Sequence, residues 1–90
     1  MDNDCHGLVH VDLNLMLVFW VLFHSPSVSS AAKRLGVGQP AVSNSLKKLR
    51  TLFNDPLFQR GGNGIRPTAK AVHIATELGP AIHRIQSVIP

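Results

Sequence analysis

Cysteine is scarce in the sequence, and long apolar runs are absent. Because Cys5 is the only cysteine, the chain cannot form an intramolecular disulfide, which is typical of a reducing compartment. The longest apolar run, Leu15 to Phe23, has nine residues, whereas a membrane-spanning helix needs about twenty. No basic segment precedes this run and no small-residue cleavage site follows it, so we expect no secretory signal. The sequence therefore predicts a cytoplasmic protein with no membrane partner, in which this run forms a buried helix.

Acidic residues are also in short supply, with five Asp and Glu against nine Lys and Arg. The imbalance is sharpest between Leu13 and Thr76, where eight cations accompany a single acid, Asp55. Concentrated positive charge favours a polyanionic partner, either nucleic acid or an anionic membrane surface, although a basic protein without such a partner is also open. The scattered acids form no carboxylate pair, and no Ser/His/Asp or Cys/His constellation is present. An enzyme is thus the least expected class, and no cofactor is predicted.

The 90 residues are enough for one small domain with a modest core. Residues 1–10 are polar and without periodicity, and we expect them to form a loose tail. Asp12 is the expected N-cap of a first helix, which ends at Pro26. This helix carries a wide apolar stripe and is predicted to be buried on more than one side, with Leu13, Met16, Trp20 and Phe23 on one face and Leu15, Phe19 and Leu22 beside it.

Two short helices joined by a tight turn are predicted next. Ser27 can cap a helix over residues 28–35, which Gly36 ends in the left-handed conformation. A third helix begins near Gln39, where Pro40 is tolerated in the first turn because its missing N–H would be unpaired there. Such a pair forms a helix-turn-helix. Ala32 is small enough to let the two helices approach, and Gly36 permits the turn. Val42 is a branched apolar residue that is expected to be buried where the third helix crosses the second.

The stretch DPLFQRGGNGIRPT predicts a small hairpin after the third helix. Leu57-Phe58 and Ile65 are strand candidates on either side of the glycine-rich turn over residues 61–64. Arg60 and Arg66 flank this turn. A hairpin that follows a helix-turn-helix is a wing.

A long helix is predicted from its N-cap, Thr68, to Ile89. Its apolar residues recur every three or four positions, which is a heptad seam of the kind that packs against a partner helix. Pro80 removes one helix hydrogen bond and is expected to kink the helix. The seam is the predicted dimer interface: Ala71, Ala75, Leu78, Ile82, Ile85 and Ile89.

The third helix has one apolar and one polar face. At about 100° per residue, four apolar residues face the core: Val42, Leu46, Leu49 and Phe53. The opposite face is centred on Lys47 and carries Pro40, Ser43, Asn44 and Thr51, with Lys48 and Arg50 at its edges. Short polar residues precede the cations, as in a helix whose N-terminal residues read bases in the major groove.

These features together resemble the N-terminal DNA-binding domain of LysR-type transcriptional regulators. The motifs that carry the resemblance are SVSSAAKRLGV, QPAVS, DPLFQR and RPTAKA, and the similarity covers about residues 11–90. It implies a mainly α fold, with a winged helix-turn-helix over residues 11–67 and a linker and dimerisation helix over residues 68–90. A homodimer bound to double-stranded DNA at an interrupted inverted repeat is expected, in the cytoplasm at the bacterial nucleoid.

The resemblance and the helix faces give two sets of DNA-contacting residues. The base-reading set is Gln39, Pro40, Ser43, Asn44 and Lys47. The set at the phosphates and the wing is Ser29, Ser30, Lys33, Lys48, Arg50, Arg60 and Arg66.

The chain departs from the family pattern in three places. Gly38 stands where the family commonly has Ser or Thr, which removes a side-chain cap. The wing tip, GGNG, lacks the basic residue often found there. Family members also carry a C-terminal effector-binding domain, which allows a small-molecule inducer and, in the full-length protein, a tetramer. We expect this chain to be a fragment without that domain.

Two alternatives from other classes stay open. The fold could serve only protein interaction, with the seam of Ile82, Ile85 and Ile89 as its functional surface. Cys5, His6 and His10 could bind zinc, but their spacing fits no closed four-ligand site, so no metal is predicted.

Overall fold

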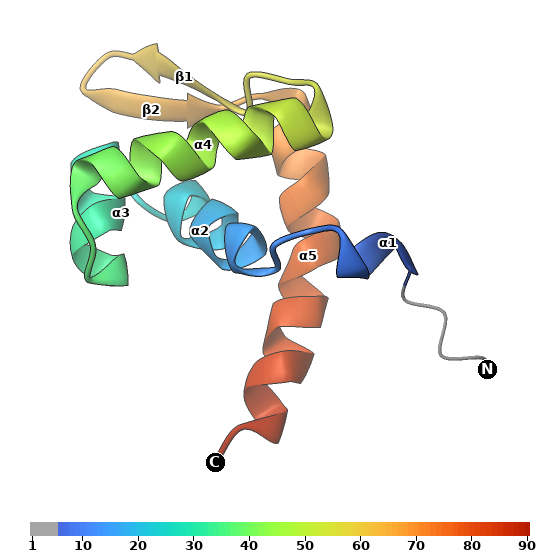
Figure 1. The fold of residues 1–90 in the computed structure, drawn as a ribbon. Coiled ribbons are helices and arrows are strands. Elements are labelled where there is room, and N and C mark those ends of the chain that lie inside the picture. Colours follow the sequence, from blue (N-terminus) through green and yellow to red (C-terminus); the bar gives the residue numbers. More distant parts are fainter. Residues whose placement is uncertain (1–5) are drawn as a thin grey trace.

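The computed structural model describes residues 6–90, which form five helices and one antiparallel hairpin (Figure 1). This architecture confirms the predicted fold class. Residues 1–5 of the expected tail lie outside the described residues, whereas residues 6–9 form one helical turn. The elements are α1 (His6–Val9), α2 (Asn14–Phe23), α3 (Val28–Leu35), α4 (Gln39–Phe53), β1 (Phe58–Gly61), β2 (Gly64–Pro67) and α5 (Ala69–Val88).

Helix α2 lies at the centre of the fold and packs against α3, α4 and α5. Asp12 Oδ1 accepts a hydrogen bond from Asn14 N at 3.0 Å, although the N-cap position itself is Leu13, one residue later than predicted. The buried residues of α2 are Leu15, Val18, Phe19 and Leu22. The prediction for Leu13 was wrong, since 54% of it is exposed. The other helices cover the stripe through Phe19, and Leu13 precedes the first turn on a different side.

The helix-turn-helix forms as predicted. Ser27 Oγ accepts a hydrogen bond from Ser30 N at 3.1 Å and so caps α3. Gly36 ends α3 with φ 70°, a left-handed conformation that glycine adopts without steric cost. Ala32 and Val42 are buried where α3 and α4 meet. The turn between the two helices therefore places the start of α4 beside the start of α3.

The hairpin is anchored to the connection between α2 and α3. Ile65 N donates a hydrogen bond to Pro26 O at 3.2 Å. Gly64 lies so close to the same carbonyl that a Cβ atom there would overlap Pro26 O. A glycine is required at this point because any side chain would push the hairpin away from the helices.

Helix α5 has a packed half and a projecting half. Thr68 caps it as predicted, and the helix continues through Pro80 as a single element. Gly79 lies against the indole of Trp20, where a Cβ atom would be 3.0 Å from Trp20 Cη2. Beyond this contact, α5 extends away from the other elements (Figure 1). Among residues 6–90, no helix combines the length and hydropathy needed to cross a membrane.

The packed half corrects the predicted dimer seam. Ala71 and Ala75 are buried within the chain's own core, and Leu78 packs against the same core. The small side chains of Ala71 and Ala75 let α5 approach α2 closely, so these two residues are not available to a partner. Ile82 is half-buried, whereas Ile85 and Ile89 are 58% and 65% exposed.

Candidate nucleic-acid interface

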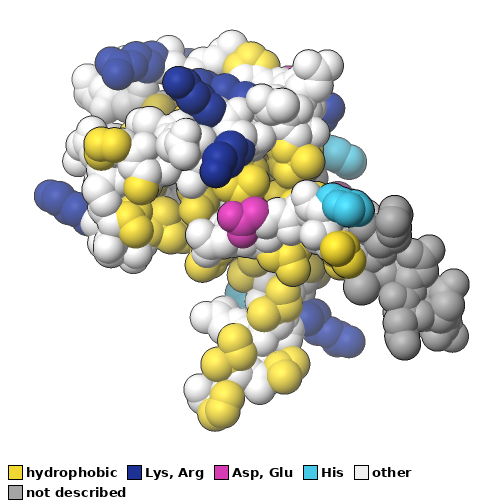
Figure 2. All heavy atoms as spheres, viewed as in Figure 1, with side chains coloured by type: hydrophobic (Ala, Val, Ile, Leu, Met, Phe, Trp, Pro, Cys, Tyr) yellow, Lys and Arg dark blue, Asp and Glu magenta, His cyan; other side chains and the backbone are white. Residues whose placement is uncertain are grey.

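Helix α4 presents a polar, outward-facing surface. Its inner residues Val42, Leu46 and Leu49 are buried, and Phe53 packs against the core, as the sequence predicted. The residues predicted to read bases are all exposed: Gln39, Pro40, Ser43, Asn44 and Lys47. Lys and Arg side chains gather over the part of the surface where α4 and the hairpin lie (Figure 2). The helix therefore offers short polar groups and cations on one accessible face.

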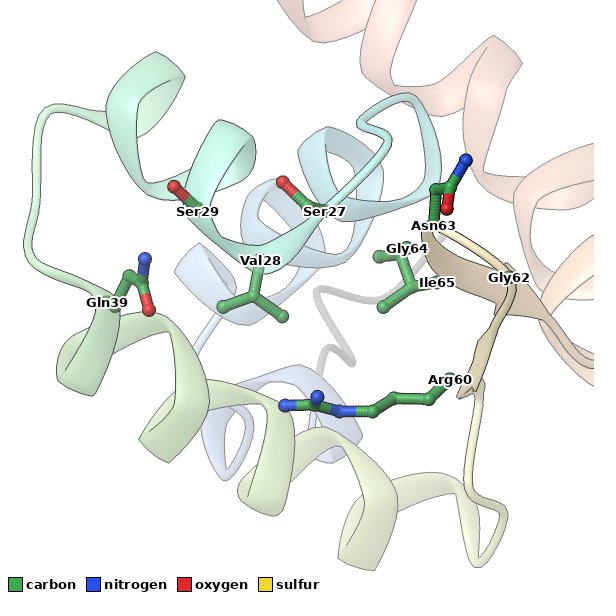
Figure 3. Close-up of a pocket in the computed structure, with 9 residues that line it drawn as sticks. All are labelled: Ser27, Val28, Ser29, Gln39, Arg60, Gly62, Asn63, Gly64 and Ile65. Carbon is green, nitrogen blue, oxygen red and sulfur yellow. The ribbon is translucent and has the colours of Figure 1, made fainter.

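A groove of about 460 Å³ separates the start of α3 and α4 from the hairpin (Figure 3). Ser27, Ser29 and Gln39 lie on its helical side. Arg60 extends from β1 across the groove toward α4. None of the nine described residues that line the groove is acidic. The groove thus combines hydroxyl, amide and guanidinium groups, which is a chemistry suited to phosphate oxygens.

Six lining residues were not among the predicted site residues: Ser27, Val28, Gly62, Asn63, Gly64 and Ile65. Val28 and Ile65 supply apolar surface to the groove, and Asn63 stands at the tip of the hairpin (Figure 3). The register could have identified Ile65, because it pairs with Arg60 and paired residues face the same side. No sequence signal marked Val28, whose position depends on how the hairpin docks on Pro26.

Arg66 does not share the groove with Arg60. The strand register pairs Arg66 with Gln59, one position away from the pair formed by Arg60 and Ile65. Neighbouring residues of a strand face opposite sides, so the two arginines occupy opposite faces of the hairpin. The Arg66 side chain lies over Gly61, where a Cβ atom would be 3.2 Å from Arg66 Cδ and Nε. Arg66 is exposed and lies on the face of the hairpin opposite Arg60.

Arg50 is engaged with the protein itself, which differs from the phosphate role predicted for it. Its Nε donates to Pro56 O at 2.8 Å, and its Nη2 donates to Phe58 O at 3.0 Å. The Pro56 carbonyl belongs to the connection between α4 and β1, and the Phe58 carbonyl belongs to the first residue of β1. A second cation, Arg34, donates through Nη1 to His24 O at 2.9 Å and links α3 to the end of α2.

The same connection contains a strained residue and an ionised carboxylate. Leu57 is fully buried with φ 62°, a conformation that costs a bulky residue on the order of 1–3 kcal/mol. Asp55 Oδ2 accepts hydrogen bonds from Thr68 Oγ1 at 2.7 Å and from Leu57 N at 2.8 Å. The Thr68 hydroxyl and then the Leu57 N–H hold the pKa of Asp55 below its ordinary value.

The remaining predicted phosphate residues lie apart from one another. Ser29 lines the groove, whereas Ser30 is half-buried and donates its N–H to the Ser27 cap. Lys33 is exposed on α3 and Lys48 on α4. The structure thus brings Ser29, Gln39 and Arg60 together around one groove.

A metal site is not formed by the described residues, which contain no group of three or more His, Cys, Asp or Glu side chains able to hold an ion. Of the residues considered as zinc ligands, Cys5 lies outside the described residues, and the His6 side chain is likewise not described.

The comparisons with known proteins identify the family. A family model described as "Bacterial regulatory helix-turn-helix protein, lysR family" matches residues 13–72. The HTH-type transcriptional regulator LeuO of Escherichia coli is 42% identical over 80 residues, which cover 89% of this chain and 26% of LeuO. The chain thus spans about a quarter of the length of this curated relative.

Solved structures agree with the fold. The crystal structure of a probable transcriptional regulator from Pseudomonas aeruginosa matches with a TM-score of 0.84 and 38% identity, over 89% of this chain and 27% of that chain. The BenM DNA-binding domain in complex with catB site 1 DNA matches with a TM-score of 0.77 and 18% identity, over 87% of this chain and 84% of that chain. The second likeness shows the shared fold.

Proposed function

Because the chain belongs to the lysR family of bacterial regulatory helix-turn-helix proteins, we propose that it binds double-stranded DNA sequence-specifically as a dimer, with α4 in the major groove. The helix-turn-helix is the DNA-binding domain of these transcriptional regulators. The observation that carries the proposal is the exposed polar face of α4, which stands beside a groove lined by Arg60 and without acidic residues. A major groove admits such a helix.

Each residue of the base-reading set offers a specific contact. Gln39 and Asn44 can pair bidentately with adenine, and Lys47 can bind the O6 and N7 acceptors of guanine. Ser43 can donate or accept, and Pro40 can contact a thymine methyl group. All five are exposed, and Gly38 supplies no side-chain cap that would compete for space at the start of α4. The discrimination is therefore expected at the N-terminal half of α4.

Phosphate contacts are proposed for the residues around the groove. Ser29 and Arg60 face it directly, with Lys33 and Lys48 on the flanking helices and Arg66 on the face of the wing opposite Arg60. Each neutralised phosphate makes the slope of log affinity against log salt concentration more negative by about 0.9. The wing is proposed to reach the adjacent backbone or minor groove.

The projecting half of α5 is the proposed dimer surface. Ile82, Ile85 and Ile89 share one side of it, and Val88 is 81% exposed. Apolar side chains this exposed on a projecting helix are stabilised by a partner helix. Two chains related by a twofold axis would present their α4 helices to an inverted repeat.

This proposal divides the chain into a DNA-binding domain over residues 11–67 and a dimerisation helix over residues 68–90. The cytoplasm, where the DNA is found, is the proposed location. Response to a small-molecule inducer, and any tetramer, would belong to a further domain of a full-length regulator.

Selection of bound duplexes from a random DNA pool tests the proposal. We expect an enriched inverted repeat that binds more tightly than its scrambled version at every salt concentration, by about 10³-fold or more. Equal affinity for both sequences would reduce the function to non-specific binding. Failure to retain any DNA at low salt would instead favour a protein-interaction module that uses the Ile85 surface.

A further inference from the structure

The turn from α4 into β1 is held in an unfavourable conformation from several sides. Leu57, its central residue, combines a positive φ of 62° with complete burial. Its N–H donates to Asp55 Oδ2 at 2.8 Å, and its carbonyl accepts from Thr68 N at 2.8 Å. A conformation that a bulky residue avoids on its own is kept here by the surrounding contacts. The direction in which the wing leaves α4 therefore depends on these contacts.

Arg50, on α4, adds two further contacts to those that hold the turn around Leu57. Its two donors reach the carbonyls of Pro56 and Phe58, the residues immediately before and after Leu57. The planar guanidinium fork can satisfy two acceptors at a fixed spacing, which a lysine ammonium does not reproduce. Arg50 therefore bridges the outer face of α4 and the first residue of the wing.

Arg60 is the wing cation closest in sequence to this bridge. It lies two residues after Phe58 and is the one Lys or Arg among the described residues that line the groove. The Arg60 side chain is long and crosses the groove (Figure 3). A small rotation at Phe58 would therefore displace its guanidinium by a large distance. Simultaneous contact of α4 and the wing with one duplex requires a fixed separation between them.

We propose that Arg50 is a positioning residue that acts on DNA through Arg60 rather than as a phosphate ligand. The proposal rests on the proposed DNA binding and deepens it, because it assigns how the wing is aimed. Two exposed cations at the edge of α4 thereby have different roles. Lys48 contacts phosphate directly, whereas Arg50 holds the wing in place.

A double-mutant cycle separates the two roles. The variants are Arg50→Gln, Arg60→Gln and their combination, each measured on the same duplex at several potassium chloride concentrations. If Arg50 acts through Arg60, each single substitution makes the salt slope about 0.9 less steep, and the double variant shows no further decrease in steepness. If Arg50 contacts a phosphate itself, the salt slope of the double variant becomes about 1.8 less steep and the losses in affinity add. Additivity, or no effect of Arg50→Gln alone, would overturn the proposal.

A conservative variant and a matched control sharpen the test. Arg50→Lys keeps the charge but loses the fork, so we expect it to behave like Arg50→Gln; behaviour like the wild type would contradict the proposal. Lys48→Gln, two residues earlier on α4, is expected to be additive with Arg60→Gln. Thermal unfolding of each variant establishes that binding is measured on folded protein.

The unsubstituted chain provides a measurement that does not depend on variant stability. In nitrogen-edited NMR spectra, the Nε–H signal of Arg50 should stay nearly unchanged on addition of DNA, while that of Arg60 shifts. A large shift at Arg50 and none at Arg60 would overturn the proposal. The salt slopes of the double-mutant cycle can also be measured on a non-specific duplex. A failure of the Arg50 proposal can therefore be distinguished from a failure of sequence-specific binding.

Discussion

Asp55 and Thr68, thirteen residues apart in the sequence, are joined by a hydrogen bond in which Thr68 Oγ1 donates to Asp55 Oδ2 at 2.7 Å. The same hydroxyl oxygen accepts from Ala71 N at 3.1 Å and caps α5. One threonine therefore ties the turn before the wing to the start of the linker helix. The wing, which is proposed to contact DNA, and the proposed dimerisation helix are coupled through this pair.

Replacement of Thr68 tests this coupling. Thr68→Val keeps the shape but removes the cap and the donor to Asp55, so we expect it to lower the free energy of unfolding by about 0.5–2 kcal/mol. Thr68→Ser keeps the hydroxyl and serves as the matched control. Denaturant unfolding measures both variants. Equal stability of Thr68→Val and the wild type would show that the hydroxyl does not hold these elements together.

The lowered pKa of Asp55 predicts a pH dependence of stability. The folded state stabilises the ionised form of Asp55 relative to the unfolded chain, in which Asp has an ordinary pKa of 3.8. The stabilisation is therefore complete well above pH 3.8 and disappears as the pH falls through the lower folded value. We expect the difference in unfolding free energy between wild type and Asp55→Asn to be constant from about pH 5 to pH 8 and to shrink below about pH 4. A difference that grows on acidification would contradict this assignment.

Gly64 is predicted to tolerate no side chain. Gly64→Ala places a methyl group against Pro26 O, so the hairpin must shift and the chain should lose about 1–3 kcal/mol of stability. Gly7→Ala is the control, because nothing lies within 4 Å of the added atom. Thermal unfolding compares them. Equal melting temperatures would mean that the wing does not dock closely on the helices.

Gly38 offers the opposite case. It occupies the N-cap of α4 with φ −78° and no side-chain cap, and a Cβ atom there meets only Pro40 Cδ at 3.5 Å. Gly38→Ser should stabilise the fold by about 0.5–1 kcal/mol, because it adds a cap and restricts the unfolded chain. Gly38→Ala, which restricts the chain without adding a cap, separates the two contributions in the same unfolding experiment. If Gly38→Ser and Gly38→Ala had the same free energy of unfolding, a serine cap at this position would not stabilise α4.

The exposed side of α5 predicts the oligomeric state. Ile85→Asp should raise the dimer dissociation constant by at least about tenfold without unfolding the domain, because Ile85 is largely exposed within one chain. Ser87→Asp adds the same charge about 200° away around the helix and is the control. Sedimentation equilibrium measures both. If Ile85→Asp dimerises like the wild type, another surface carries the association.

The sequence indicated helices α2 to α5 and the turn because each has a local signal, whereas the short helix α1 lies in the stretch that was expected to form a loose tail. Ser27, Gly36 and Thr68 mark helix ends through capping and backbone conformation, and the structure confirms all three. The apolar spacing of α4 likewise identified its buried face. Local signals of this kind depend only on residues a few positions apart.

Features that depend on tertiary packing were not predictable in the same way. The heptad pattern of α5 could not tell Ala75, buried by the chain itself, from Ile85, which is exposed. The roles of Arg50 and Arg66 depend on a strained turn and on strand register. Sequence alone located these cations but not the direction in which they act.

The central claim is that the outward face of α4, together with Arg60, contacts DNA. The most direct measurement is an NMR titration of the 90-residue chain with the selected duplex. The account predicts that the largest shift changes fall on Gln39, Ser43, Asn44 and the Arg60 side chain, with smaller changes along α2. Changes confined to α2 or to the projecting half of α5, with the α4 face unperturbed, would contradict it.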